Sequence, residues 1–224
     1  MFNALRASRS FQVSLVFVAG LAVLAGPALL ADQAKPTAAS EPAWQTLFDG
    51  KTLGNWAPTK FFRQGMVSVQ NGQILLDVGG DLTGITWAGG ELPTTSYELA
   101  LQAMRVDGSD FFAAITFPVD DSFCSLILGG WGGTIVGLSS INGMDASENE
   151  TSQSIDFEQN RWYGVRIRVT PARIEAWLDD RQIVNQLLKD NRVDTRIEVD
   201  ASQPLGVASW RTKSALRDIR LRRL

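Results

Sequence analysis

The sequence contains no histidine, and this absence excludes several kinds of catalytic and metal site. Ser-His-Asp and Cys-His nucleophilic catalysis need an imidazole as general base, and His-ligated metal sites need one as a ligand. Acid–base chemistry must therefore use Asp, Glu, Lys, Arg or Tyr side chains. A bound metal would be a hard cation such as Ca²⁺, held by oxygen atoms.

Cysteine is nearly absent too. Cys124 is the single one, so the chain cannot form an internal disulfide. It lies in the apolar run Phe123–Leu128, which favours a small buried hydrophobe over a reactive thiol. The 224 residues are 45% hydrophobic, which is enough to bury a core without covalent links and is typical of one domain.

After residue 31, basic residues are fewer than acidic ones. Residues 1–31 contain two arginines and no acid, so the remainder holds 19 basic and 24 acidic residues, a net charge of −5. An acidic protein is a poor nucleic-acid binder, and we expect no nucleic-acid partner. The basic tail Arg217–Arg223 alternates with a period of two, which predicts the solvated face of a final strand.

The N-terminus has the pattern of a secretion signal. Arg6 and Arg9 precede the apolar run Phe11–Leu30, and Ala28 and Ala31 are small residues suited to cleavage. We expect a signal peptide over residues 1–31, cleavage near Ala31, and a periplasmic or extracellular protein without membrane contact after cleavage. The alternative is an uncleaved anchor, because about 20 apolar residues can span a bilayer. Residues 32–43 form an Ala/Pro/Ser/Thr linker.

Long amphipathic helices are also lacking. Residues 44–224 instead show about twelve short alternating segments separated by turn signals, a pattern typical of an all-β sandwich or barrel. Asn71-Gly72 between two apolar runs predicts a hairpin. Tyr97–Val106 and Arg161–Thr170 alternate cleanly, and Pro118 is expected to end the strand before it. We predict a two-sheet antiparallel jelly-roll sandwich.

The most unusual stretch is Leu128–Thr151 in the middle of the chain. It begins with Gly-Gly-Trp-Gly-Gly around Trp131 and ends in a short acidic run. A loop system on a rigid β-scaffold is a favoured place for function. The glycine run is not a phosphate loop, because the required Gly-Lys-Ser/Thr is missing.

The acidic run offers candidate catalytic and metal ligands. Asp145, Glu148 and Glu150 lie within six residues and could act in acid–base catalysis. Asp145, Glu148 and Asn149 could hold Ca²⁺. The alternative interpretation is a solvated acidic loop.

Further candidates could contact a ligand. Trp131 could stack on a sugar, or it could be a core residue at a tight corner. Asp110 follows a turn and could contact a ligand or cap that turn. Arg166 and Trp177 lie on the outward face of a predicted hairpin pair, with Arg168 and Glu175. If that face is concave it could hold a polyol, whereas on a convex face these residues would form cross-strand ion pairs.

The opening Leu-Phe-Asp-Gly-Lys-Thr-Leu-Gly-Asn-Trp at Leu47–Trp56, and the later order of strands, resemble the 3-keto-disaccharide hydrolases, which include 3-keto-glucoside lyases and hydratases. The resemblance covers residues 44–224. It implies a concanavalin A-like, laminin-G-like jelly roll, export, and action on or binding to sugars. Two polar patterns of the family are replaced here by Leu101–Met104 and Cys124–Leu128, so the family's catalytic residues cannot be transferred to these positions.

Three hypotheses follow. The first is an exported, carbohydrate-active domain that cleaves glycosidic bonds of 3-keto sugars with a carboxylate of the Asp145–Glu150 loop, aided in one version by Ca²⁺. The second is a non-catalytic lectin-like or laminin-G-like module that binds a glycan or a protein. The third is a purely structural periplasmic domain.

Overall fold

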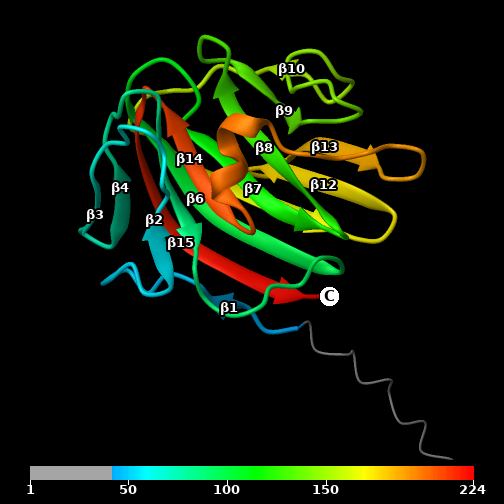
Figure 1. Cartoon of the computed structure of the whole chain (residues 1–224), viewed down its shortest axis with the longest axis horizontal. Helices are drawn as coiled ribbons and strands as arrows, with labels where there is room; N and C mark the ends of the chain where they lie inside the picture. Colours follow the sequence, from blue (N-terminus) through cyan, green and yellow to red (C-terminus); the bar gives the residue numbers. More distant parts are fainter. Residues whose placement is uncertain (1–41) are drawn as a thin grey trace, which may run out of the picture. The chain divides into compact units, whose positions relative to one another are not determined.

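A computed structural model describes residues 42–224, so the predicted signal peptide and nearly all of the predicted linker lie outside the described residues. Within 42–224, no helix is long and apolar enough to cross a membrane. The described chain forms fifteen strands and one 3₁₀ helix, η1 (Figure 1). Their bounds are β1 Gln45–Thr46, β2 Trp56–Pro58, β3 Val67–Gln70, β4 Gln73–Leu76, β5 Leu82–Trp87, β6 Tyr97–Asp107, β7 Ala113–Val119, β8 Ser122–Gly130, β9 Ile135–Ser139, β10 Gln153–Ser154, β11 Trp162–Val169, β12 Arg173–Leu178, β13 Arg181–Leu187, η1 Ile197–Ser202, β14 Gly206–Trp210 and β15 Lys213–Arg223.

The strands make two antiparallel sheets. Sheet A has the order β13-β12-β11-β6-β15-β4-β3, and β1 also pairs with β15. Sheet B has the order β10-β9-β8-β7-β14-β5-β2. Neighbours in space are often distant in sequence, as where β6 lies between β11 and β15. The predicted two-sheet jelly-roll sandwich is confirmed.

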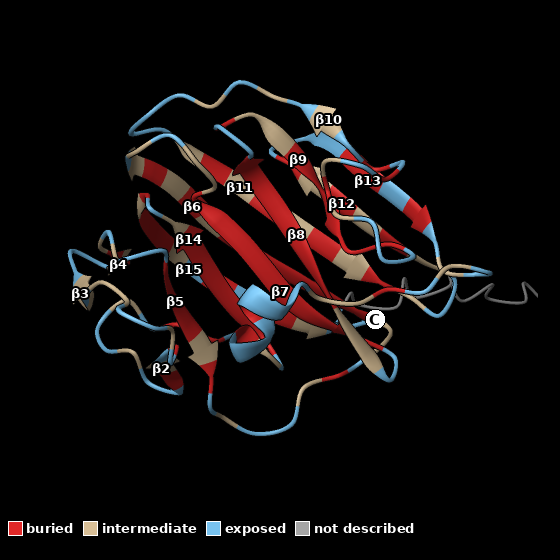
Figure 2. Ribbon diagram, turned by 45° about the horizontal axis from the view of Figure 1, so that its top comes forward, coloured by how far each residue is buried: buried red, intermediate tan, exposed pale blue. Residues whose placement is uncertain are grey.

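The core fills the space between the sheets, where Figure 2 shows buried residues in red along the strands of both layers. In β11 the inward residues Tyr163, Val165, Ile167 and Val169 alternate with half-buried outward ones, as the sequence predicts.

Cys124 is fully buried in β8, and burial raises the pKa of its thiol to about 12. The interpretation of Cys124 as a small buried hydrophobe is therefore confirmed.

Local turn chemistry explains the hairpins. Asn71 and Gly72 connect β3 to β4 with φ of 52° and 78°, the paired positive angles that an Asn-Gly turn adopts at little cost. The prediction that Pro118 ends its strand is wrong, because Pro118 lies inside β7. Strand β14 pairs with β7 only at Ala114–Thr116, so the missing N–H of Pro118 falls beyond that pairing.

Candidate functional site

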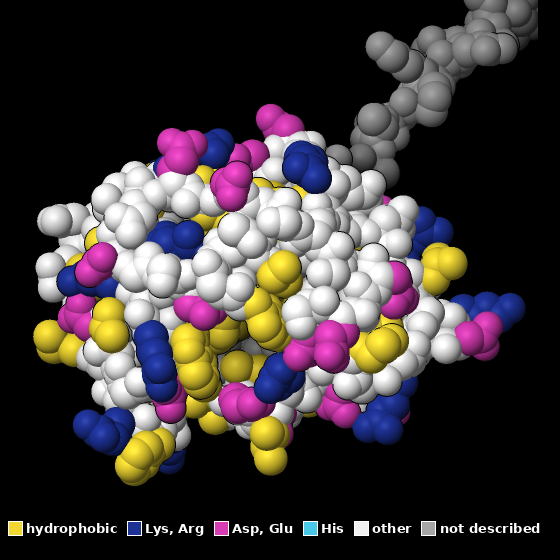
Figure 3. Space-filling model, turned by 90° about the horizontal axis from the view of Figure 1, so that it is seen from above, with side chains coloured by type: hydrophobic (Ala, Val, Ile, Leu, Met, Phe, Trp, Pro, Cys, Tyr) yellow, Lys and Arg dark blue, Asp and Glu magenta, His cyan; other side chains and the backbone are white. Residues whose placement is uncertain are grey.

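A cleft of about 190 Å³ lies on the outer face of sheet B, beside η1. Figure 3 shows hydrophobic side chains gathered around a hollow, with acidic and basic side chains nearby. We call this the sheet B cleft. Its lining residues are Leu82, Asp110, Phe111, Ser125, Ile127, Trp131, Ser139, Arg196, Glu198, Val199 and Trp210.

Strand alternation sets the floor of the cleft. In β8, Cys124 and Leu126 are buried in the core, so Ser125 and Ile127 face outward into the cleft. The Ser125 hydroxyl pairs with that of Thr116 at 2.8 Å. The Ser139 hydroxyl, on a residue only 1% exposed, has no hydrogen-bond partner among the described residues. The floor is thus mainly apolar, with one buried hydroxyl that has no partner among the described residues.

Trp131 stands at the edge of this cleft with 43% of its surface exposed. Its φ is 48°, in the left-handed region that a bulky side chain rarely adopts. Gly129, Gly132 and Gly133 around it also have positive φ. The alternative of a core tryptophan is therefore wrong, while the tight corner is present. A costly backbone conformation that presents a large exposed ring is a feature found at functional sites.

Arg105 of β6 holds this glycine-rich corner. Its Nη2 donates to the carbonyl oxygens of Asp110, Gly129 and Gly133 at 3.1, 3.2 and 2.9 Å. The residue is only 6% exposed, and burial lowers its pKa, an effect partly offset by the Asp110 carboxylate. The role of Arg105 is absent from the sequence-based prediction. The sequence does contain a signal for this role. Arg105 alternates in register with Leu101 and Ala103, so its side chain points into the core, where a charge needs partners.

Asp110 lies beside Trp131 in the cleft lining. Its Oδ1 accepts the N–H of Phe111 at 2.7 Å, and its Oδ2 accepts the N–H of Gly132 at 3.4 Å. Both carboxylate oxygens thus contact the backbone of the loops at the cleft. Of the two roles expected for Asp110, the turn cap is present, and the side chain also lines the cleft, where it could contact a ligand.

The acidic run forms a compact turn next to the cleft. Asp145 accepts the N–H and hydroxyl of Ser147 and pairs with Arg196 at 2.6 Å. The Asn149 amide is buried, donating to Leu138 O and accepting from Thr151. The side chains of the remaining two candidates, Glu148 and Glu150, are exposed and do not line the cleft. Across residues 42–224, no three acidic or cysteine side chains are grouped to hold a metal ion.

Arg196 connects the acidic run to the cleft. It contacts Asp145 on one side and Glu198 at 2.9 Å on the other, and both Arg196 and Glu198 line the cleft. The hydrogen bond from Arg196 lowers the pKa of Glu198, which favours its ionised form. The sequence does not predict Arg196 or Glu198 as site residues. They lie at the start of a 3₁₀ helix about 65 residues after Trp131, and no sequence motif marks them.

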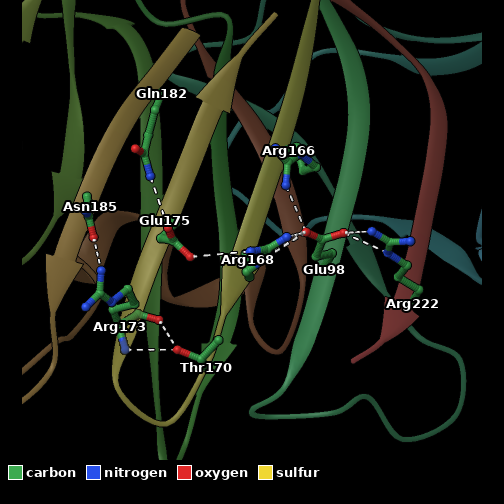
Figure 4. A network of polar contacts seen from close by, with 9 residues as sticks. All are labelled: Glu98, Arg166, Arg168, Thr170, Arg173, Glu175, Gln182, Asn185 and Arg222. Atoms are coloured by element: carbon green, nitrogen blue, oxygen red, sulfur yellow. Dashed lines mark hydrogen bonds and ion pairs between the residues drawn. The ribbon is translucent and has the colours of Figure 1, made fainter. Parts of the chain in front are cut away.

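The other two candidates, Arg166 and Trp177, lie on the outer face of sheet A and not with Trp131. The Arg166 guanidinium stacks on the Trp177 ring at 3.6 Å and donates to Glu98 at 2.9 Å. Arg168 contacts both Glu98 and, at 3.9 Å, Glu175 (Figure 4). The expected cross-strand ion pairs are therefore present on this face.

Comparisons with known proteins agree with this fold. The sequence model of the 3-keto-alpha-glucoside-1,2-lyase-like domain matches residues 43–222. A search of curated proteins finds no similar sequence. Among solved structures, the apo Crh5 transglycosylase has a TM-score of 0.55 at 13% identity, covering 81% of this chain and 83% of that one.

Two further structures are carbohydrate-related. Domain 4 of AbnA, an extracellular arabinanase of Geobacillus stearothermophilus solved with arabinotriose, has a TM-score of 0.51 at 14% identity over 81% and 91% of the two chains. The Emp46p carbohydrate recognition domain has a TM-score of 0.52 at 12% identity over 76% and 88%. At these identities the likeness concerns the fold alone. The match over residues 43–222 shows that the chain belongs to the 3-keto-alpha-glucoside-1,2-lyase-like domain family, a carbohydrate-related, glycosyl hydrolase-like β-sandwich.

Proposed function

We propose that the sheet B cleft binds a single sugar ring, with the exposed face of Trp131 as its stacking platform. The observation that carries this proposal is the 43% exposed Trp131 ring held at φ 48° beside the cleft. Aromatic rings offer apolar contact to the C–H faces of a pyranose, and the backbone strain persists only where surrounding contacts maintain it. Arg105 supplies those contacts by fixing three carbonyl oxygens of the corner.

The size and polarity of the cleft suit a ring better than a chain. A volume of about 190 Å³ leaves room for one sugar ring inside the cleft. Arg196 and Glu198 offer a donor and an acceptor to sugar hydroxyls at the rim. A few polar groups set in an apolar pocket are typical of small-molecule sites.

The state of the carboxylates favours binding over hydrolysis. Glycoside hydrolysis commonly needs a protonated carboxylic acid with a raised pKa, opposite a second carboxylate. The pKa of Glu198 is instead lowered by Arg196, and the Asp110 oxygens accept backbone N–H groups. The described lining residues therefore do not include a protonated carboxylic acid opposite a second carboxylate.

A second candidate function is cleavage of a 3-keto-glycoside, which the family match over residues 43–222 favours. In such an elimination, ionised Glu198 would take the proton from the carbon between the ketone and the anomeric carbon. A carbon–carbon double bond would form, and the glycosidic oxygen would leave with the bonding electrons and take up a proton. Incubation with 3-keto-disaccharides, with and without Ca²⁺, separates the candidates. The binding proposal expects no monosaccharide release. Release together with a keto sugar that carries the new carbon–carbon double bond, both lost in Glu198→Gln, would establish the elimination.

The binding proposal predicts a specific effect of Trp131→Ala. On a glycan array, followed by calorimetric titration of the best sugar, we expect affinity about 10- to 30-fold weaker than that of the wild type, the loss usual for an aromatic hot spot. Phe62→Ala is the matched control, because Phe62 is 86% exposed and lies outside the cleft. Equal affinities of wild type and Trp131→Ala would overturn the stacking role.

We also propose that the domain acts after export, because residues 1–31 have the pattern of a signal peptide. N-terminal sequencing of the protein from its native cells tests this proposal. A mature chain starting near residue 32 supports it, and an intact Met1 terminus in the cytoplasm contradicts it.

A further inference from the structure

The outer face of sheet A carries a second ordered array of side chains, distinct from the sheet B cleft. Antiparallel register aligns residues of β11, β6 and β15 in rows across the sheet. The three rows are Arg166, Ala100 and Arg220; Gly164, Gln102 and Arg217; and Arg168, Glu98 and Arg222. A bulge at Arg217–Arg220 lets both of these arginines face outward although they are three residues apart.

The row through Glu98 is already occupied by ion pairs. Glu98 is 0% exposed and accepts from Arg166 at 2.9 Å, Arg168 at 2.8 Å and Arg222 at 2.6 Å (Figure 4). One negative charge is thus surrounded by three positive ones. The centre of this face keeps an excess positive charge, although the chain after residue 31 is acidic overall.

The row through Ala100 is open. Gly164 and Ala100 leave a hollow of about 540 Å³ between the longer side chains, and Arg166, Arg220 and Trp44 are among the residues that line it. The small residues create the space, and the arginines stand on either side of it. Their strands are two spacings apart, roughly 10 Å, so both long side chains can reach one group above Ala100.

The two lining arginines keep hydrogen-bonding capacity. Arg166 is stacked on Trp177 and donates only its Nη1 to Glu98. Arg220 stacks on Trp44 at 4.8 Å, and it makes no ion pair with any residue in 42–224. Stacking restricts each guanidinium plane. The N–H groups at its edge, apart from the Arg166 Nη1 that donates to Glu98, can bind a carboxylate or sulfate at two points.

The acidic residues of the hollow do not cancel this charge. Asp179 accepts the Gly164 N–H at 2.8 Å and pairs with Arg161 at 3.1 Å. Asp218 also lines the hollow, and its carboxylate is 3.7 Å from Arg217, which does not line it. Each acid therefore has its own arginine, while Arg220 has no acidic partner among the described residues.

We propose that the hollow over Ala100 binds the anionic group of an acidic glycan, a uronate carboxylate or a sulfate ester. This second site goes beyond the proposed sugar-ring cleft. A glycan fits the carbohydrate-related family of the chain. A membrane surface fits less well, because interfacial binding needs inserted apolar side chains and none of the exposed large hydrophobic residues described lines the hollow.

The test is affinity electrophoresis of the full chain through gels holding polygalacturonate, dextran sulfate or neutral dextran. We expect retardation by at least one anionic polymer, none by dextran, and weakening with added salt because surface charges are screened. Arg220→Gln should weaken binding at least tenfold, and Ala100→Glu should abolish it. Arg223→Gln, the same charge change on an exposed arginine outside the hollow, should weaken it less than threefold.

Three outcomes overturn the proposal. They are no binding to either anionic polymer, equal weakening by Arg220→Gln and Arg223→Gln, and binding to anionic lipid vesicles without binding to the polymers. Trp131→Ala should leave this binding unchanged. The two sites therefore fail or succeed independently.

Discussion

We expect Glu98→Gln to lower the free energy of unfolding by about 3 kcal/mol, since removing one partner of a buried ion-pair cluster typically costs 3–5 kcal/mol. The substitution keeps the shape of the side chain but removes the single charge that Arg166, Arg168 and Arg222 share. We expect the low end of that range because Arg166 and Arg168 are 35% exposed and can regain water. Urea denaturation measures the change.

Glu175→Gln is the matched control. The Glu175 carboxylate lies 3.9 Å from Arg168, at the limit of an ion pair, and it is 17% exposed. We expect this substitution to change the free energy of unfolding by less than about 1 kcal/mol, as for ordinary surface pairs. Equal effects of the two substitutions would contradict the central place of Glu98 in the network.

The Glu98 effect should also depend on pH. Burial alone would raise the pKa of Glu98, but hydrogen bonds from Arg168, Arg222 and Arg166 outweigh it and hold the pKa below the ordinary value of 4.5. A carboxyl group whose pKa is lowered by folding stabilises the fold fully above its unfolded-state pKa, and this contribution is lost as pH falls through the folded-state value. The stability gap between wild type and Glu98→Gln should stay constant near neutral pH and shrink below pH 4.5.

The second large effect is expected for Arg105→Met. Loss of the guanidinium leaves the carbonyl oxygens of Asp110, Gly129 and Gly133 without their shared donor. Each buried polar group without a partner costs about 1–3 kcal/mol, so we expect at least about 3 kcal/mol of destabilisation. Because these carbonyl groups belong to the loops at Trp131, sugar affinity should fall as well.

Two further variants isolate this role. Arg211→Met removes a 63% exposed arginine paired with Asp81, and we expect less than about 1 kcal/mol. Arg105→Lys keeps the charge but lacks the branched head that serves several carbonyl groups at once, so it should restore little of the stability. Wild-type stability and sugar affinity in Arg105→Met would refute the clamp.

Much of the sandwich could be predicted from local patterns. Alternation along Tyr97–Val106 and Arg161–Thr170 predicts that one face of each strand lies in the core. Burial alternates strictly in β11, whereas the first five residues of β6 are all buried because ion pairs cover its outer face at Glu98. Asn71-Gly72 encodes its own hairpin through the positive φ that both residues tolerate. Trp131 and Asp110 could be nominated because they adjoin glycine-rich or turn segments.

The assembly of the cleft could not be predicted in this way. Its lining extends from Leu82 to Trp210 and depends on which strands are neighbours in sheet B, which local periodicity does not determine. Arg196 and Glu198 enter the cleft from a 3₁₀ helix that lacks a sequence signature. The rows of sheet A likewise depend on the pairing of β6 with β11 and β15.

The most direct test of the sugar cleft uses the indole N–H signals of the seven tryptophans in a ¹H–¹⁵N NMR titration with a neutral sugar selected on the array. We expect the signals of Trp131 and Trp210, which line the sheet B cleft, to shift on binding. The signals of Trp44, Trp162 and Trp177 on the outer face of sheet A should stay in place. Shifts confined to those three tryptophans, with no change in the Trp131 signal at saturation, would contradict sugar binding in the sheet B cleft.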